Sequence, residues 1–253
     1  MPMQMGWRWY GEDNDPITLS DIKQIPGVTS IVWALHHKMP GEIWEENEIK
    51  EVMDQIHAYG FNGDVVESVN VHDDIKIGLP TRDQYIENYK QCIRNLSKFG
   101  VKVICYNFMP VFDWLRSSLD YENKDGSTSL IYRDSDVLAM DPRSGDLSLP
   151  GWDSSYTKEG LGKLLEEYKA VDDEVLWKNL EYFLKGIIPT CEECGVKMAI
   201  HPDDPPWGIF GLPRIIIDGE NLERFLKLVD SPCNGLTLCT GSLGVNPKNN
   251  IPE

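Results

Sequence analysis

Two stretches of the sequence join the end of a helix to the start of a strand in the same way. They are Phe99-Gly-Val-Lys-Val-Ile-Cys-Tyr and Cys194-Gly-Val-Lys-Met-Ala-Ile-His. In each, the glycine can supply the left-handed backbone that ends a helix. The apolar run that follows is typical of a strand buried on both faces. A repeated unit of helix and buried strand predicts an α/β fold with a parallel sheet.

The same unit recurs along the chain. A short helix capped by Thr18 is expected first. We then expect helices at 46–59, 81–99, 172–194 and 221–229 and strands at 7–10, 28–35, 63–71, 101–108, 196–200 and 235–239. This alternation predicts a single domain over residues 1–253, a TIM (β/α)8 barrel that lacks its last two βα units. An open six-stranded sheet is the alternative.

Residues 109–170 interrupt the alternation after the fourth expected strand. The segment is polar and aromatic, and it contains Asp125-Gly-Ser and Leu149-Pro-Gly-Trp. Structureless loops of this length are uncommon in compact domains. We therefore expect an insertion that folds as a lid or subdomain, or that makes an oligomer contact.

Charge and composition exclude several classes of partner. The formal net charge is −17, and no basic face for nucleic acid is visible. No apolar run reaches the roughly 18 residues of a membrane span. The start of the chain lacks the basic and apolar segments of a signal peptide, so we expect a cytoplasmic protein. The six cysteines stand mostly in apolar patterns, which indicates reduced thiols.

Polar residues gather where the expected strands end. Three prolines, Pro202, Pro205 and Pro206, forbid continued ladder pairing after the strand at 196–200. Active sites of α/β proteins lie at the carboxyl ends of parallel strands. The polar residues at these ends are Arg8, His36, His37, Glu67, Asn107, His201, Asp203, Asp204 and Cys239.

His201 and Cys239 follow neighbouring strands, and imidazole with thiolate is half of a plausible metal site. The alternative is a hydrogen-bonded structural histidine and a core cysteine. Glu67 stands inside an apolar strand, which is costly unless the carboxylate is paired or bound to a metal. Cys191 and Cys194 form a CxxC at a helix end with no second pair, which argues against redox or zinc chemistry there.

Several longer motifs resemble the mannonate dehydratase family, and the similarity runs through the whole chain. These motifs are Trp7-Arg-Trp-Tyr, Val66-Glu-Ser-Val, Cys105-Tyr-Asn-Phe-Met-Pro-Val-Phe-Asp-Trp, Leu149-Pro-Gly-Trp, Ala199-Ile-His-Pro-Asp-Asp-Pro-Pro and Asn234-Gly-Leu-Thr-Leu-Cys-Thr-Gly-Ser. The resemblance implies a TIM barrel of the xylose-isomerase-like superfamily. It also implies a homodimer that dehydrates D-mannonate to 2-keto-3-deoxy-D-gluconate in glucuronate and other hexuronate catabolism.

The family's metal site holds Mn2+ or Fe2+ through His, Cys, His and Asp. Its first two ligands correspond to His201 and Cys239 of this chain. The other two ligands, and the His and Tyr proposed for proton transfer, are expected beyond residue 253. The catalytic residues are therefore unassigned. Either the protein extends further, or the chain is an inactive truncated barrel.

Strand-end position and the family-like motifs together suggest the substrate-binding groups. Arg8, Asn107 and Asp113 are expected to bind the hydroxyls or carboxylate of the sugar acid, and Glu67 and Asp203 are further candidates. A related metal-dependent sugar-acid isomerase or epimerase is the nearest alternative function. Its product would be an isomer of the substrate, whereas a dehydratase forms a 2-keto-3-deoxy acid.

Overall fold

A computed structural model describes residues 3–12, 14–142 and 158–252. The Leu149-Pro-Gly-Trp motif lies outside the described residues. The chain forms two compact units. The first comprises Met1–Asn107, Asn179–His201 and Arg224–Thr237, and the second comprises Phe108–Lys178, Pro202–Glu223 and Leu238–Glu253. The prediction of a single domain stays a prediction, as does the role of the insertion as a lid.

The first unit is built on a parallel sheet of six strands, whose order β1-β2-β3-β4-β7-β8 follows the chain. The strands are β1 (Met5–Arg8), β2 (Val28–Trp33), β3 (Asn62–Glu67), β4 (Val103–Tyr106), β7 (Lys197–Ile200) and β8 (Asn234–Leu236). Each strand pairs with the next one along the sheet, as in the first six strands of a (β/α)8 barrel. The predicted α/β fold with a parallel sheet is confirmed.

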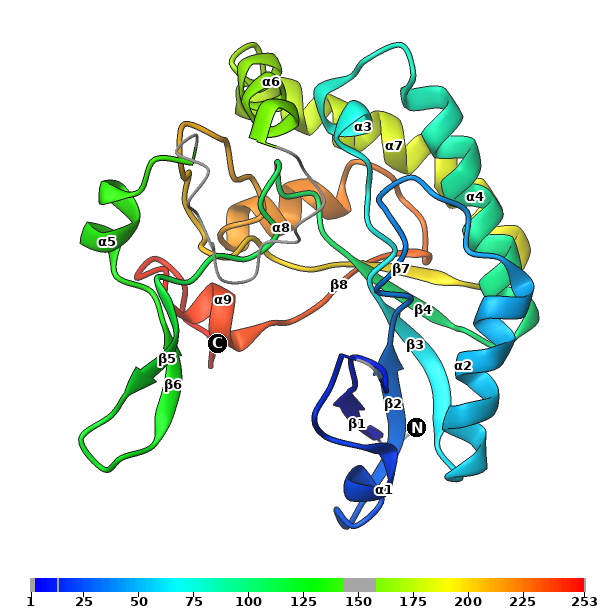
Figure 1. Ribbon diagram of the computed structural model, residues 1–253. Helices are drawn as coiled ribbons and strands as arrows, with labels where there is room; N and C mark the ends of the chain where they lie inside the picture. Colours follow the sequence, from blue (N-terminus) through cyan, green and yellow to red (C-terminus); the bar gives the residue numbers. More distant parts are fainter. Residues whose placement is uncertain (1–2, 13, 143–157, 253) are drawn as a thin grey trace. The chain divides into compact units, whose positions relative to one another are not determined.

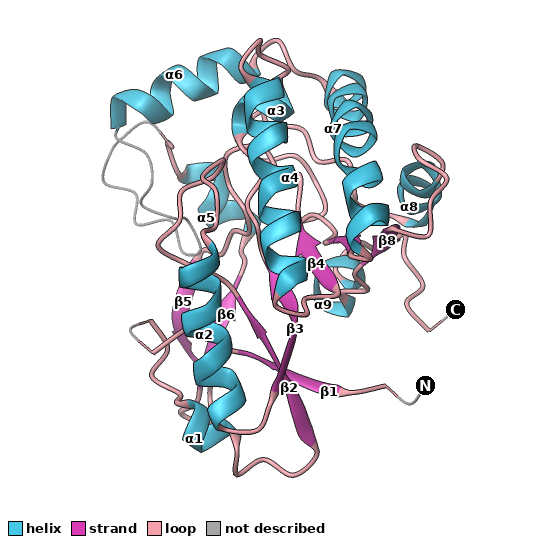
Figure 2. Cartoon of the chain, turned by 90° about the vertical axis from the view of Figure 1, so that its right-hand side faces the viewer, coloured by secondary structure: helices cyan, strands magenta, loops and turns pink. Residues whose placement is uncertain are grey.

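Helices cover one side of this sheet (Figures 1 and 2). In the first unit they are α1 (Leu19–Ile22), α2 (Glu46–Ala58), α3 (Asp73–Ile77), α4 (Arg82–Lys98), most of α7 (Asp173–Cys194) and the end of α8 (Gly219–Leu226). Their apolar stripes and the strands make the core, in which Ile56, Leu96, Ile104 and Phe183 are fully buried. No helix that the structure describes is both long and apolar enough to cross a bilayer.

The glycines at the predicted helix ends have the expected backbone. Gly60, Gly100 and Gly195 have φ values of 74°, 86° and 65°, which glycine adopts without strain from a side chain. The predicted helices therefore end within a few residues of their expected positions. Thr18 caps α1 as predicted, and Thr18 and Asp21 form a reciprocal capping box.

Five of the six sheet strands end earlier than predicted: β1, β2 and β4 by two residues each, β8 by three and β3 by four. β3 stops at Glu67, although Val69 and Val71 beyond it are buried. An apolar run in the sequence indicates that residues are buried. The end of a strand depends instead on where its hydrogen bonds to the neighbouring strand end. The last pair between β3 and β4 is Glu67 with Cys105. β8 stops at Leu236, so Cys239 lies beyond the strand and precedes a short helix, α9 (Thr240–Gly244).

The second unit contains the insertion. It forms a two-stranded antiparallel hairpin of β5 (Ser118–Glu122) and β6 (Thr128–Ile131), followed by α5 (Asp134–Ala139) and α6 (Lys158–Tyr168). Asp125-Gly126 lies in the hairpin turn, and Gly126 has a φ of 82°. The unit also includes residues 202–223 and α9.

Candidate active site

Five side chains from three strands and two strand-end loops of the first unit form what we call the strand-end cluster: Arg8, His36, Glu67, Cys105 and Thr237. Glu67 and Cys105 are register partners on β3 and β4. Arg8 ends β1, and Thr237 follows β8. These are the carboxyl ends of parallel strands, the usual position of active sites in such sheets.

Arg8 is the centre of this cluster. Its Nε lies 3.4 Å from Glu67 Oε2, one terminal nitrogen donates to the Trp9 carbonyl at 2.8 Å, and the other lies 3.4 Å from His36 Nε2. The guanidinium also lies 4.5 Å from the centre of the Tyr10 ring. Burial lowers the pKa of Arg8, and the nearby Glu67 opposes this shift. Because a guanidinium is not deprotonated in proteins, the group remains a cation at neutral pH.

Glu67 connects Arg8 to two uncharged groups. Cys105 Sγ lies 3.5 Å from Glu67 Oε1 and 3.2 Å from Thr237 Oγ1. Thr237 Oγ1 lies 3.3 Å from the Ala199 carbonyl. The predicted pairing of Glu67 is therefore present, with Arg8 as its cation. The cluster combines a fixed positive charge with hydroxyl, thiol and carboxylate groups, which suits a small polyhydroxylated anion.

Other predicted residues of the first unit lie at the same carboxyl edge of the sheet. The His201 backbone N–H donates to the Tyr106 carbonyl at 2.6 Å, so the residue continues the pairing of β7 with β4. Asn107 directly follows β4 and is half-buried. His36 and His37 diverge as expected, because His37 pairs with Glu48 at 2.9 Å while His36 lies against Arg8.

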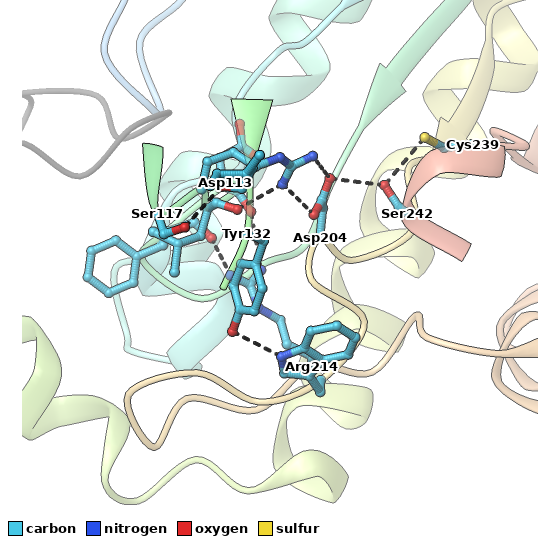
Figure 3. A network of polar contacts seen from close by, with 12 residues as sticks. Asp113, Ser117, Tyr132, Asp204, Arg214, Cys239 and Ser242 are labelled. Atoms are coloured by element: carbon cyan, nitrogen blue, oxygen red, sulfur yellow. Dashed lines mark hydrogen bonds and ion pairs between the residues drawn. The ribbon is translucent and has the colours of Figure 1, made fainter. Parts of the chain in front are cut away.

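A second polar group lies within the second unit, and we call it the Asp204 network: Arg116, Asp204, Ser242 and Cys239 (Figure 3). Arg116 donates to both oxygens of Asp204, at 2.8 and 2.9 Å. Ser242 Oγ lies 3.2 Å from Asp204 Oδ2 and 3.3 Å from Cys239 Sγ. Hydrogen bonding to Asp204 raises the pKa of Arg116, so the guanidinium stays charged.

Asp203 and Asp113 were predicted to bind substrate, and both also make contacts within the protein. Asp203 is 1% exposed, and its Oδ2 accepts backbone hydrogen bonds from Ile215 and Ile216 at 2.7 and 3.0 Å. The buried Arg214 lies 3.4 Å from the Asp113 carbonyl oxygen. Burial lowers the pKa of Arg214, and Asp203 is the main opposing charge. These hydrogen bonds give Asp203 a structural role as well, and the binding of substrate by Asp203 and Asp113 stays a prediction.

The two predicted metal ligands belong to different units, His201 to the first and Cys239 to the second. Imidazole and thiolate are suitable donors for divalent transition metals, so the residue types fit such an ion. Among residues 3–12, 14–142 and 158–252, no set of three or more His, Cys, Asp or Glu is arranged to hold a metal. The chemical types of His201 and Cys239 thus suit a divalent metal ion, and among the described residues these two donors are fewer than a complete set of metal ligands.

The CxxC cysteines lack the features of a redox pair. Cys191 is fully buried, and burial raises the pKa of its thiol to about 12. Reactive cysteines need an accessible thiolate. All six cysteines are free, in agreement with the expected reduced thiols.

Sequence reasoning missed four members of these groups: Cys105, Arg116, Thr237 and Ser242. None stands at the end of an expected strand, and each acquires its partners through tertiary structure. One signal was present for Ser242, because it stands three residues after Cys239, where helical spacing brings two side chains together. No comparable local pattern marks Arg116.

Comparison with solved structures first defines the class. A 3-keto-D-glucoside 4-epimerase from E. coli matches with a TM-score of 0.53 and 12% identity, over 98% of this chain and 72% of that one. At this identity only the fold is shared. The chain is therefore an α/β protein with a parallel sheet, and it shares that fold with this structure.

Closer similarity identifies the family. A mannonate dehydratase structure from Streptococcus suis serotype2 matches with a TM-score of 0.90 and 49% identity, over 99% of this chain and 68% of that one. Mannonate dehydratase 1 from Bacillus licheniformis is 57% identical over 98% of this chain and 70% of its own length. The family model for D-mannonate dehydratase (UxuA) matches residues 3–253. The chain belongs to the mannonate dehydratase family, whose members are hydro-lyases, and the resemblance seen in the sequence is confirmed.

Proposed function

We propose that this chain supplies substrate-binding and metal-binding groups for the dehydration of D-mannonate to 2-keto-3-deoxy-D-gluconate. The observation that carries the proposal is the strand-end cluster, in which the Arg8 cation is held by Glu67 among hydrogen-bonding groups. The substrate named for the relatives is a sugar acid, which has one carboxylate and several hydroxyls. A guanidinium beside neutral polar groups is chemically complementary to that combination.

In this reaction a proton leaves C2, beside the carboxylate, and the hydroxyl on C3 departs as water after protonation. The enol that remains becomes a ketone, so no oxidant or reductant is needed. Negative charge accumulates on the substrate carboxylate as the C2 proton leaves. Arg8 would bind that carboxylate, and Glu67 would hold the guanidinium in orientation. The side chain of Arg8 is 23% exposed, so few water molecules compete with the carboxylate.

We further propose that His201 and Cys239 bind the divalent ion, Mn2+ or Fe2+. When bound, such an ion supplies Lewis-acid stabilisation of developing negative charge. The donor types support this assignment, and they would also accept Zn2+. Metal analysis of the purified full chain checks it, because His201→Ala and Cys239→Ala should each carry less bound metal than the unaltered protein.

The activity test uses the purified protein that carries this chain together with any sequence that continues it, freed of metal by a chelator and then supplied with Mn2+ or Fe2+. With D-mannonate, we expect a 2-keto-3-deoxy acid, identified by NMR and by the loss of one water from the substrate mass. An isomer with unchanged mass would instead establish an isomerase or epimerase. No conversion with either ion would overturn the proposal.

Three further assignments belong to the same proposal. We propose that the protein is a homodimer, that it works in hexuronate catabolism in the cytoplasm, and that neither nucleic acid nor a membrane is its partner. The net charge of −17 supports the last of these. Light scattering after size-exclusion chromatography tests the dimer, since a mass equal to one chain would contradict it.

A further inference from the structure

We propose that Ser242, held by Asp204 and Arg116, is the residue that positions the Cys239 sulfur. This inference rests on the proposed function, in which Cys239 is a metal ligand. It assigns a role to three residues that are neither metal ligands nor expected substrate-binding groups. All members of the Asp204 network lie within the second unit.

The Arg116–Asp204 pair provides a rigid base. Two parallel hydrogen bonds of 2.8 and 2.9 Å fix the plane of the carboxylate as well as its distance. The Arg116 guanidinium also lies 5.4 Å from the centre of the Trp114 ring. The side chain of Asp204 is only 15% exposed, so its oxygens are largely withdrawn from solvent. Asp204 therefore presents a fixed acceptor to the next member of the network.

Ser242 is that next member, and it is 2% exposed. Its Oγ lies 3.2 Å from Asp204 Oδ2 and 3.3 Å from Cys239 Sγ. A serine hydroxyl has one proton to donate and lone pairs that accept. It can accept from a thiol while donating to Asp204, or donate to a sulfur that has lost its proton. The hydroxyl thus keeps a hydrogen bond to the sulfur in either state.

The direction of the hydroxyl distinguishes this arrangement from ordinary helix packing. A serine in a helix commonly bonds to a backbone carbonyl one turn earlier. Ser242 instead contacts two functional side chains, one on its own segment and one in the segment after β7. Cys239 stands before the first residue of α9, so helix bonding fixes its backbone less than that of an interior residue. The hydrogen bond with Ser242 adds a constraint on the position of the sulfur.

Groups that hydrogen-bond to metal ligands orient them, and their loss typically costs about 10- to 100-fold in metal affinity. We therefore expect Ser242→Ala to bind Co2+ about 10-fold more weakly than the unaltered chain, with a diminished sulfur-to-cobalt charge-transfer band. Ser242→Thr, which keeps the hydroxyl, should restore both. Asp204→Asn should fall between the two, because it removes the charge that orients the hydroxyl.

The experiment titrates Co2+ alone into the metal-free full chain and records near-ultraviolet absorbance, with thermal melts to show that each variant is folded. Ser127→Ala is the matched control, since its hydroxyl also bonds to an aspartate, Asp125, in the hairpin turn of the same unit. It should leave the affinity and the band unchanged. If Ser242→Thr is poorly folded because of its buried methyl group, Asp204→Asn provides the second variant.

The outcomes separate this inference from the proposed function. If Cys239→Ala abolishes the band while Ser242→Ala and Asp204→Asn leave affinity and band unchanged, the positioning role is overturned and the metal assignment stands. If Cys239→Ala binds Co2+ as the unaltered chain does, the metal assignment fails and the positioning role falls with it.

Discussion

Among single residues, Arg8 should affect sugar-acid binding most directly. We predict that Arg8→Gln raises the KM for D-mannonate by roughly 10- to 100-fold, because a hydrogen bond to a charged group contributes about 1.5–3 kcal/mol. Steady-state kinetics measures the change. Arg82→Gln is the control, since Arg82 lies over the Tyr182 ring on the helical side of the first unit. An unchanged KM in Arg8→Gln would contradict the role in carboxylate binding.

Asp203 stands where the sequence predicts a substrate-binding residue, and it also accepts hydrogen bonds from the protein backbone. Replacing it by alanine leaves two backbone N–H groups unsatisfied and removes the main charge facing the buried Arg214. We predict that Asp203→Ala lowers the free energy of unfolding by about 3 kcal/mol, measured by urea denaturation. The exposed Asp230→Ala should change it little. An unaltered stability with weaker D-mannonate binding would instead support the original substrate-binding prediction.

At the scale of elements, a comparison of two glycines distinguishes the cost of backbone strain from the cost of a steric clash when either is replaced by alanine. Gly41 and Gly100 share a φ of +86°, but a Cβ on Gly41 would lie 2.5 Å from the Tyr85 ring, whereas at Gly100 nothing lies within 4 Å. The Tyr85 ring stacks on His72 with centroids 3.7 Å apart, so it cannot easily move. We predict a loss of about 1 kcal/mol for Gly100→Ala and a clearly larger loss for Gly41→Ala. Equal losses in denaturation experiments would contradict this.

Helix α3 depends on a titratable cap. His72 Nδ1 accepts a hydrogen bond from the Asp74 backbone N–H at 3.0 Å, which requires a neutral ring. Burial lowers the pKa of His72 from its ordinary value of 6.5, and the positive charge of Lys76 lowers it further. The negative charges of Asp74 and Asp73 act in the opposite direction and raise this pKa. The unfolded chain therefore binds a proton first as the pH falls. The contribution of His72 is complete above about pH 6.5 and is lost as pH falls toward the lower folded-state pKa.

We predict that His72→Asn, which keeps a side-chain oxygen at the cap, has a smaller loss of stability between about pH 7 and pH 5 than the unaltered chain. Chemical denaturation at a series of pH values measures this difference. The slope of the free energy of unfolding against pH is the decisive quantity. The variant also loses the stacking on Tyr85, but this loss lowers its stability at every pH. Parallel pH profiles would show that His72 does not titrate on unfolding.

The helices and the parallel strands were predictable because their signals are local. Gly60 and Gly100 mark helix ends, and each following apolar run marks a buried strand. The hairpin also had a signal that was not used, since Asp125-Gly126 separates two segments of alternating character. Strand ends were less predictable, because they depend on the length of the neighbouring strand. Glu67 therefore ends β3, although apolar residues follow it.

The site was predictable only in part, for a related reason. Arg8, Glu67 and His201 could be chosen because strand ends converge in a parallel sheet. Arg116 could not, because the contact that gives it a role joins it to Asp204, 88 positions away, and the contact of Ser242 with Asp204 likewise spans 38 positions. Distant pairings of this kind leave no periodic trace in one sequence. Long-range polar networks therefore have to be read from the structure.

At the scale of the whole molecule, the chain leaves the first unit three times, each time directly after a strand of the sheet. It passes into the second unit after Asn107, after His201 and after Thr237. These positions directly follow β4, β7 and β8. The carboxyl ends of three sheet strands are thus where additional structure has been built. In many α/β proteins the sheet is the scaffold and the loops after its strands carry the functional residues, and this chain has the same arrangement of added structure.

The thiols provide a test that covers both units. All six cysteines are free, and burial raises the pKa of Cys92 to about 11 and that of Cys191 to about 12. We predict that the chain unfolded without reductant releases six equivalents with Ellman's reagent, whereas at about pH 8 the folded chain reacts slowly at Cys92 and Cys191, because the thiolate is the reactive form. Peptide mass spectrometry after partial labelling identifies the slow sites. Fewer than six equivalents after unfolding would indicate a disulfide. Rapid labelling of Cys191 in the folded chain would show a reactive thiolate there and would support a redox role for the CxxC pair.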